Sequence, residues 1–200
     1  MKLYYSPASC SLAPHIAAAE AGVSLDLVKV DLGAHKTEAG DDYYAINPRG
    51  YVPLLELDDG TRLTEASVLV QVIADANPSA NLLPADGIAR VKVQSWLAFI
   101  STELHKGFGP LWDPSAPDET KASAKKKLAT RYEELNRVLG HQAFIAGDTF
   151  TVADAYGFTV TNWTRFHNID LTAYPNVQAW MSRVGQRPKV VEAMKQEGLM

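Results

Sequence analysis

The chain has 200 residues, of which 46% are hydrophobic and 21% are charged, a composition typical of folded globular proteins rather than disordered or fibrous ones. Its net charge of -4 provides no general attraction for nucleic acid or for an anionic membrane surface. The single cysteine cannot form an internal disulfide, and no apolar run is long enough to cross a bilayer or to resemble a signal peptide. We therefore expect a cytoplasmic protein that binds neither nucleic acid nor membrane.

The first part of the chain alternates strand and helix signals. Residues 2–5 read as a short strand, and a helix is expected over residues 11–21, with Ser11 as its N-cap and Gly22 at its end. Residues 25–32 then alternate apolar and polar side chains as a half-buried strand does. This order predicts a β-α-β unit.

A hairpin and a helix are expected next. Residues 52–57 read as a strand despite Pro53, and Asp59-Gly60 supplies a two-residue turn into a strand at residues 62–63. Apolar residues at helical spacing predict a helix over residues 66–76. The pattern of the first 80 residues is thus mixed α/β.

Strand signals disappear beyond residues 77–87, a stretch with two prolines, a glycine and few large residues, and we place the linker itself at residues 81–86. The sequence therefore predicts a first domain over residues 1–80 and an all-α second domain over residues 87–200. Helices are expected over residues 88–106, 119–139, 151–166 and 176–186, with a last short one near the C-terminus. Two breaks, at residues 107–110 and 112–114, are expected to separate the first two of these helices.

One acidic residue of the second domain has a structural interpretation. Thr151 precedes a predicted helix, and Asp154 follows it three residues later, the spacing of a variant capping box. We expect Asp154 to hold the start of this helix rather than to act in catalysis.

Cys10 is the only sulfur nucleophile of the chain, and it lies between the first strand and the first helix. Free backbone N–H groups and the helix dipole at such a place favour an anion, so we expect a lowered thiol pKa. The alternative is a small buried apolar residue, a common role for a free cysteine. Hydroxyl groups that could also act in catalysis are carried nearby by Tyr5, Ser9 and Ser11. We expect Tyr5 to pack in the strand and Ser11 to cap the helix, so Cys10 is the preferred catalytic residue.

Two further positions suggest a site for an extended peptide. A cis Val52–Pro53 bond would turn the Val52 N–H and C=O groups outward, where a peptide could pair with them. Glu65, Ala66 and Ser67 stand at a helix start, where amides can bind a carboxylate and the Glu65 carboxylate can bind an ammonium group. The alternative is ordinary helix capping by Thr64, with Glu65 as a favourable negative charge in the first turn.

These motifs, in this order, resemble the bacterial beta-class glutathione S-transferases along essentially the whole chain. Residues 5–12, 47–53 and 63–65 carry the resemblance in the first domain, and residues 102–108 and 150–155 carry it in the second. The resemblance implies a thioredoxin-like domain followed by a helical-bundle domain, in a homodimer that binds glutathione in each subunit.

The resemblance also assigns roles by position. Cys10 would meet the glutathione sulfur, with His105 nearby, and both are the expected catalytic residues. The expected glutathione-binding residues are Cys10, His35, Val52, Pro53, Glu65, Ala66, Ser67, Thr102, His105 and Lys106.

Two positions depart from the pattern of the class. His35 stands where relatives often carry a lysine, and Ala98 where they often carry an asparagine. Helical spacing places Ala98, Thr102 and His105 on one helix face, but alanine cannot donate a hydrogen bond. These departures predict a lower affinity for glutathione.

The implied reaction is transfer of the glutathione thiol to a hydrophobic electrophile, by displacement of a halide or by addition. Phe108, Leu111 and Trp112 are expected to line the electrophile pocket. The alternatives are a glutathione-dependent thiol reductase or reductive dehalogenase acting through Cys10, or a non-catalytic ligand-binding protein. The histidines lack the spacing of metal ligands, so we expect no metal site.

Overall fold

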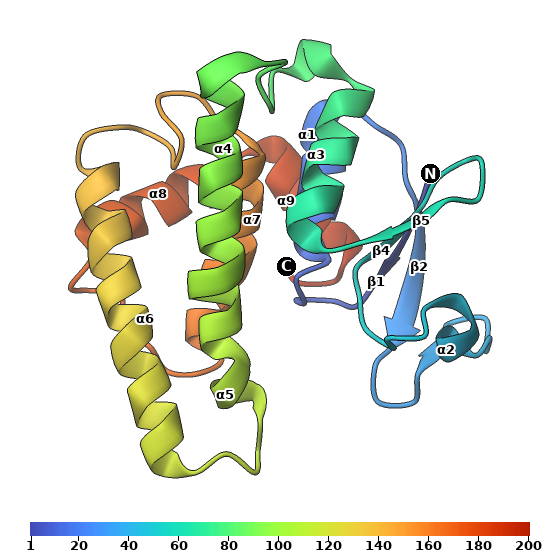
Figure 1. Cartoon of the computed structure of the whole chain (residues 1–200), viewed down its shortest axis with the longest axis horizontal. Coiled ribbons are helices and arrows are strands. Elements are labelled where there is room, and N and C mark those ends of the chain that lie inside the picture. The colour runs from blue at the N-terminus through green and yellow to red at the C-terminus, as the bar shows by residue number, and fades with distance from the viewer. The chain divides into compact units, whose positions relative to one another are not determined.

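The computed structural model describes all residues from Met1 to Met200. The chain forms two compact units (Figure 1). The sheet unit consists of Met1–Ala85 together with Arg187–Met200, and the helical unit consists of Asp86–Gln186.

The sheet unit contains a mixed five-stranded sheet with the strand order β3-β2-β1-β4-β5. β1 pairs with β2 in parallel, whereas the β1–β4, β2–β3 and β4–β5 pairs are antiparallel. The strands are β1 Lys2–Tyr5, β2 Asp26–Asp31, β3 Lys36–Thr37, β4 Leu54–Glu56 and β5 Arg62–Thr64.

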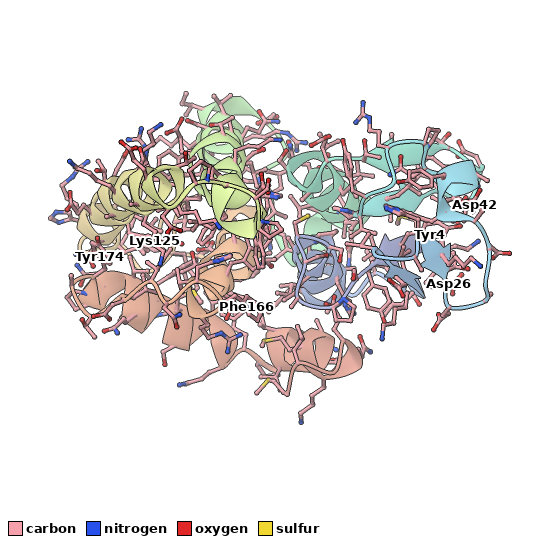
Figure 2. All side chains as sticks on the ribbon, turned by 90° about the horizontal axis from the view of Figure 1, so that it is seen from below. Tyr4, Asp26, Asp42, Lys125, Phe166 and Tyr174 are labelled. Carbon is pink, nitrogen blue, oxygen red and sulfur yellow. The ribbon has the colours of Figure 1, made fainter.

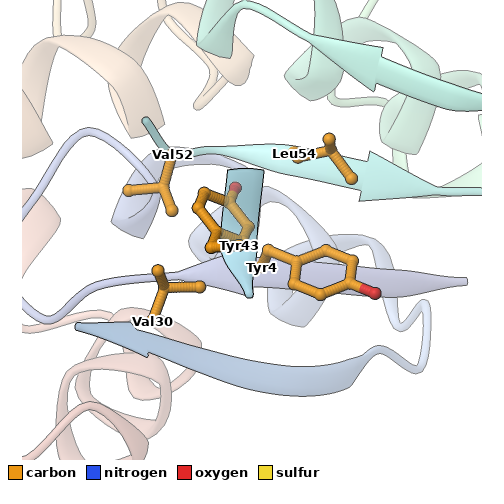
Figure 3. Close-up of a cluster of buried hydrophobic side chains, with 5 residues drawn as sticks. All are labelled: Tyr4, Val30, Tyr43, Val52 and Leu54. Carbon is orange, nitrogen blue, oxygen red and sulfur yellow. The ribbon is translucent and has the colours of Figure 1, made fainter. Parts of the chain in front are cut away.

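Alternation along the strands sends neighbouring side chains to opposite faces of the sheet. One face carries a buried cluster that includes Tyr43 of the short helix α2 (Tyr43–Ile46), packed beside Tyr4 and Val52 (Figure 3). The Tyr4 and Tyr43 ring centroids are 5.8 Å apart. Since Val52 belongs to this cluster, packing of α2 helps to hold the loop that precedes β4.

Three longer helices complete the sheet unit, namely α1 Leu12–Ala21, α3 Ala66–Ala76 and α9 Pro188–Gln196, and a 3₁₀ turn η1 covers Pro78–Ala80. Helix α1 packs against both α3 and α9. Arg187 makes two hydrogen bonds of 2.7 Å with the Glu20 carboxylate of α1, and Val190 and Ala193 of α9 are fully buried. The segment Arg187–Met200 therefore packs with the first unit, whereas the sequence analysis groups it with the helical domain.

The predicted order of elements in the first domain is confirmed, and α3 has the predicted bounds. The hairpin differs in detail. Leu57 and Thr61 still pair through the Leu57 N–H, which leaves a loop of residues 58–60 instead of a two-residue turn. Gly60 adopts a φ of 83° there, a conformation that its missing Cβ permits.

The helical unit contains no strand, as the sequence predicts. Its elements are α4 Gly87–Phe99, the π-helix η2 Ile100–His105, the 3₁₀ turn η3 Lys106–Phe108, α5 Gly109–Trp112, α6 Asp118–Leu139, α7 Val152–Thr161, the 3₁₀ turn η4 Asn162–Arg165 and α8 Pro175–Gly185. Figure 2 labels Lys125 on α6 and Tyr174 just before α8. The Tyr174 ring lies 6.0 Å from that of Tyr132 on α6, between centroids. The break expected at residues 107–110 is wrong, because η3 and α5 continue the helical path to Trp112, whereas the path does end at the second expected break, residues 112–114.

The capping box at the start of α7 is confirmed. Thr151 Oγ1 accepts a hydrogen bond from Ala153 N, and Asp154 reaches back to Thr151 N at 2.9 Å. Asp154 also accepts hydrogen bonds from Ile145 N and Trp180 Nε1. This buried carboxylate thus joins the start of α7 to the preceding loop and to α8.

No helix of the chain is long and apolar enough to cross a membrane.

Candidate active site

Cys10 lies on the loop between β1 and α1, two residues before the helix begins. Its Sγ donates a hydrogen bond of 3.4 Å to the carbonyl oxygen of Val52. The Val52–Pro53 peptide bond is cis, the geometry that would turn the Val52 N–H and C=O groups outward. The structure therefore brings together Cys10 and the Val52–Pro53 segment, which lie 42 positions apart in the chain.

The expectation of a lowered thiol pKa is wrong for the chain as it stands. Burial raises the pKa of Cys10 to about 12, although part of the residue's surface is still exposed. The negative charge of Glu65 raises this pKa slightly further, and a backbone N–H opposes the shift. The protonated form fits the geometry, because only a thiol can donate to Val52 O. At neutral pH, Cys10 is consequently a thiol and a hydrogen-bond donor.

The loop that carries Cys10 is held by its own serines. Ser11 Oγ accepts from Ser6 N and donates to Ser6 O, each at 3.1 Å, and lies 2.7 Å from Ser9 Oγ. Ser11 precedes α1 as predicted, but its side chain makes no cap hydrogen bond to the helix. Its buried hydroxyl instead closes the loop from residue 6 to residue 11.

A buried carboxylate of the C-terminal segment also holds this loop. Glu197 Oε2 accepts a hydrogen bond from Ala8 N at 3.3 Å, and its Oε1 lies 3.0 Å from His15 Nδ1 on α1. Ala8 has a φ of 62°, which is unusual for a residue with a Cβ. Glu197 thus secures a strained residue two positions before Cys10.

Replacing Glu197 with alanine should therefore lower the free energy of unfolding by about 2 kcal/mol, because it leaves the Ala8 N–H and the His15 ring without this buried partner. Urea denaturation measures this change. The matched control is Glu192→Ala on α9, the helix that Glu197 directly follows, because the exposed ion pair of Glu192 with Lys189 is worth only about 0.3 to 0.5 kcal/mol. Equal losses from the two variants would contradict the anchoring role.

Glu65 stands immediately before α3, together with Ala66 and Ser67 in the first turn. Its backbone has a φ of 73° and a ψ of 109°, a conformation that non-glycine residues rarely adopt and that often marks a functional position. Its carboxylate is 56% exposed and accepts a hydrogen bond of 3.3 Å from Arg49. The first amides of α3 have no acceptor within the helix, so an acidic group can bind beside this accessible carboxylate.

His35 is less suited to bind a carboxylate. Its Nδ1 lies 3.1 Å from the Gly50 carbonyl oxygen, and its ring stacks on Tyr44 with centroids 4.3 Å apart. A carbonyl oxygen only accepts, so Nδ1 carries a proton. In the neutral ring Nε2 is then an acceptor, and only a charged His35 can also donate from Nε2.

The remaining expected residues, Thr102, His105 and Lys106, lie in the helical unit. The expected face rests on α-helical spacing, but Ile100–His105 is a π-helix, whose wider turns change the direction of each successive side chain. Thr102 is exposed, and its hydroxyl donates to Ala98 O at 3.0 Å. Lys106 is also exposed, whereas His105 is half-buried.

His105 makes a short contact with a neighbouring helix. Its Nδ1 lies 2.6 Å from the hydroxyl oxygen of Tyr156 on α7, and its ring meets that of Trp163 nearly edge-on at 4.8 Å. Burial lowers the pKa of His105 to about 4, with a smaller contribution from Lys106. The ring is therefore uncharged at neutral pH.

Phe108 is 0% exposed and belongs to the core, so it does not line the expected apolar wall. Trp112 is 49% exposed and Leu111 is half-buried, so both can contact a ligand. No group of three or more histidine, cysteine, aspartate or glutamate side chains is arranged to hold a metal ion.

Comparison with known proteins agrees with this geometry. Residues 8–76 match the family described as the glutathione S-transferase N-terminal domain, and residues 99–188 match the glutathione S-transferase C-terminal domain. The chain belongs to the glutathione S-transferase family. It is 45% identical to glutathione S-transferase GstA of Escherichia coli O157:H7, with full coverage of both chains.

Two solved structures extend the similarity to three dimensions. The bacterial beta-class glutathione S-transferase of Sphingomonas chungbukensis is 45% identical and superposes with a TM-score of 0.96, and each chain is fully covered. A sphingomonad glutathione S-transferase complexed with glutathione is 44% identical, also with a TM-score of 0.96 and full coverage. The protein is thus a glutathione transferase with a thioredoxin-like domain and a helical domain, and glutathione is its co-substrate.

Sequence reasoning missed three residues at these positions, namely Arg49, Tyr156 and Glu197. Arg49 lies within residues 47–53, which carry the resemblance, and its charge could have suggested an ion pair with Glu65. No local signal distinguishes Glu197 or Tyr156, because each acts on a residue at least 50 positions away.

Proposed function

We propose that this enzyme conjugates glutathione to hydrophobic electrophiles. The glutathione thiolate attacks an electrophilic carbon and forms a C–S bond, while a halide leaves with its electron pair or an activated double bond takes up a proton. The observation that carries this proposal is the Cys10 thiol beside Val52, because a protonated thiol can donate a hydrogen bond to a neighbouring thiolate without repelling it.

The binding residues follow from the same arrangement. The Val52 backbone beside Pro53 pairs with the cysteinyl part of glutathione, and Glu65 binds the γ-glutamyl ammonium, while the first amides of α3, from Ala66 and Ser67, bind the γ-glutamyl carboxylate. The remaining contacts are assigned to His35, Thr102, His105 and Lys106. Because Ala98 offers only its backbone and His35 donates from Nε2 only when charged, we expect weaker binding than with an asparagine and a lysine at these positions.

The electrophile is apolar in this proposal because Trp112 and Leu111 offer an accessible apolar surface. We further propose a homodimer that detoxifies such compounds in the cytoplasm. The free cysteine and the absence of any disulfide fit a reducing compartment. Light scattering during size-exclusion chromatography tests the dimer, and a monomer at micromolar concentration would contradict it.

Replacing Cys10 tests the function directly. Cys10→Ala should lower the rate of glutathione conjugation to a simple aryl halide by about two- to tenfold, the value of one lost hydrogen bond. Cys10→Ser is the matched variant, because its hydroxyl can still donate, and it should retain more activity than Cys10→Ala. The measurement is kcat/KM for the aryl halide at saturating glutathione.

Reduction of a glutathione mixed disulfide is the assay that separates conjugation from thiol reduction, because in a reductase Cys10 would be the attacking nucleophile. Wild-type enzyme that reduced the mixed disulfide but did not conjugate the aryl halide would overturn the proposal. Absence of both activities, with glutathione still bound, would instead identify a ligand-binding protein.

A further inference from the structure

The chemistry of the two groups indicates which one donates in the hydrogen bond between His105 and Tyr156. The two atoms are 2.6 Å apart, a distance typical of a strong hydrogen bond with an O–H donor. The imidazole nitrogen lone pair is a better acceptor than the phenol oxygen, whose lone pairs are delocalised into its ring. The Tyr156 hydroxyl is therefore the donor and His105 Nδ1 is the acceptor.

We propose that Tyr156 is a positioning residue that holds His105 in the tautomer with its proton on Nε2, and so makes His105 a neutral hydrogen-bond donor. The neutral imidazole carries one proton, and if Nδ1 accepts from Tyr156, that proton is on Nε2. Burial supports this assignment, because the lowered pKa of His105 keeps the ring uncharged at neutral pH.

The surroundings of Tyr156 make it suitable for this role. Tyr156 is 1% exposed and lies on α7, where every residue is buried and where the Asp154 capping box holds the first turn. The His105 ring, the other partner of this hydrogen bond, is restrained by an edge-on contact with Trp163, with ring centroids 4.8 Å apart. The hydroxyl is therefore carried by a rigid element, whereas His105 ends a π-helix, a local irregularity that is frequent at functional sites.

The consequence for the reaction rests on the proposed function. A ring with Nδ1 occupied and a proton on Nε2 cannot remove the proton of glutathione. It can donate a hydrogen bond to negative charge on the glutathione sulfur or on the electrophile, and no proton is transferred in that step. Under the proposed function, His105 therefore acts through electrostatic stabilisation and not as a general base.

Nitrogen-15 NMR of the full-length wild-type enzyme tests the tautomer without any activity assay. Histidine-labelled protein at pH 7 should show one imidazole with a protonated Nε2 and an unprotonated Nδ1, and this signal should be missing from a His105→Gln sample. A proton on Nδ1 of His105, or on both nitrogens at pH 7, would overturn the proposal. Since this result does not require turnover, it stands even if conjugation activity is absent and the proposed function fails.

Tyr156→Phe removes the hydroxyl and keeps the ring that packs in α7. We expect the His105 signal to shift toward a mixture of tautomers, and kcat for aryl halide conjugation to fall about three- to tenfold while KM for glutathione changes less than twofold. Tyr132→Phe is the matched control, because Tyr132 is another fully buried tyrosine of the helical unit and its ring packs beside that of Tyr174. An unchanged tautomer in Tyr156→Phe, or an equal shift in Tyr132→Phe, would contradict the positioning role.

Discussion

Replacing Asp154 with alanine is expected to lower the free energy of unfolding by about 3 to 5 kcal/mol. Asp154 is 0% exposed and accepts hydrogen bonds from two backbone amides, the Thr151 hydroxyl and the Trp180 indole. Alanine leaves these buried donors without acceptors, and each such loss costs about 1 to 3 kcal/mol when water cannot replace the partner. The loss is shared by α7, the preceding loop and α8, so we expect a large effect.

Urea denaturation followed by tryptophan fluorescence measures this change, because Trp180 itself reports on the site. The matched control is Asp148→Ala, since Asp148 is exposed and lies six positions earlier in the same region. We expect its unfolding midpoint to stay close to that of the wild type. A loss of less than 1 kcal/mol in Asp154→Ala would show that the loop relaxes and supplies other acceptors.

The second large effect is expected for glutathione binding. Glu65→Gln should raise the KM for glutathione by about tenfold to a hundredfold, because a hydrogen bond between charged groups is worth roughly 1.5 to 3 kcal/mol. The ammonium group that Glu65 is proposed to bind keeps its charge throughout the reaction. The interaction therefore contributes equally in the ground and transition states, and kcat should be nearly unchanged.

Steady-state kinetics at varied glutathione concentration measures both constants, and Glu38→Gln is the control, since it neutralises an exposed carboxylate of the same unit. Loss of the exposed contact with Arg49 costs little, so it should not affect folding. If kcat fell while KM stayed constant, Glu65 would belong to the chemical step, and the proposed placement of glutathione would be wrong.

Local sequence signals predicted the elements that depend on local chemistry. The helix over residues 66–76 has the same bounds in the structure, and Gly22 ends α1 in the left-handed conformation that glycine favours. The pair Thr151 and Asp154 forms its capping box as expected, because the two residues lie within one helical turn. Each of these features is complete within a few residues, so the sequence contains the whole interaction.

The sequence did not predict the chemical state of the site. Cys10 stands before a helix, which favours a thiolate, yet its thiol donates to a carbonyl that is 42 positions away and its pKa is raised. His105 was placed by α-helical spacing, but the segment is a π-helix, and its ring nitrogen is occupied by Tyr156. Helix periodicity reports only the average hydrogen-bond pattern and cannot reveal such a local change.

The sequence by itself determined the class of the fold, because turn chemistry, capping and hydrophobic period act over short distances, and its motifs determined the family. Only the tertiary structure decided that the last helix packs on α1, that Glu197 holds the loop before Cys10, and that Cys10 and His105 are uncharged at neutral pH. Burial and long-range hydrogen bonds set protonation states, and both depend on which distant residues the folded chain brings together.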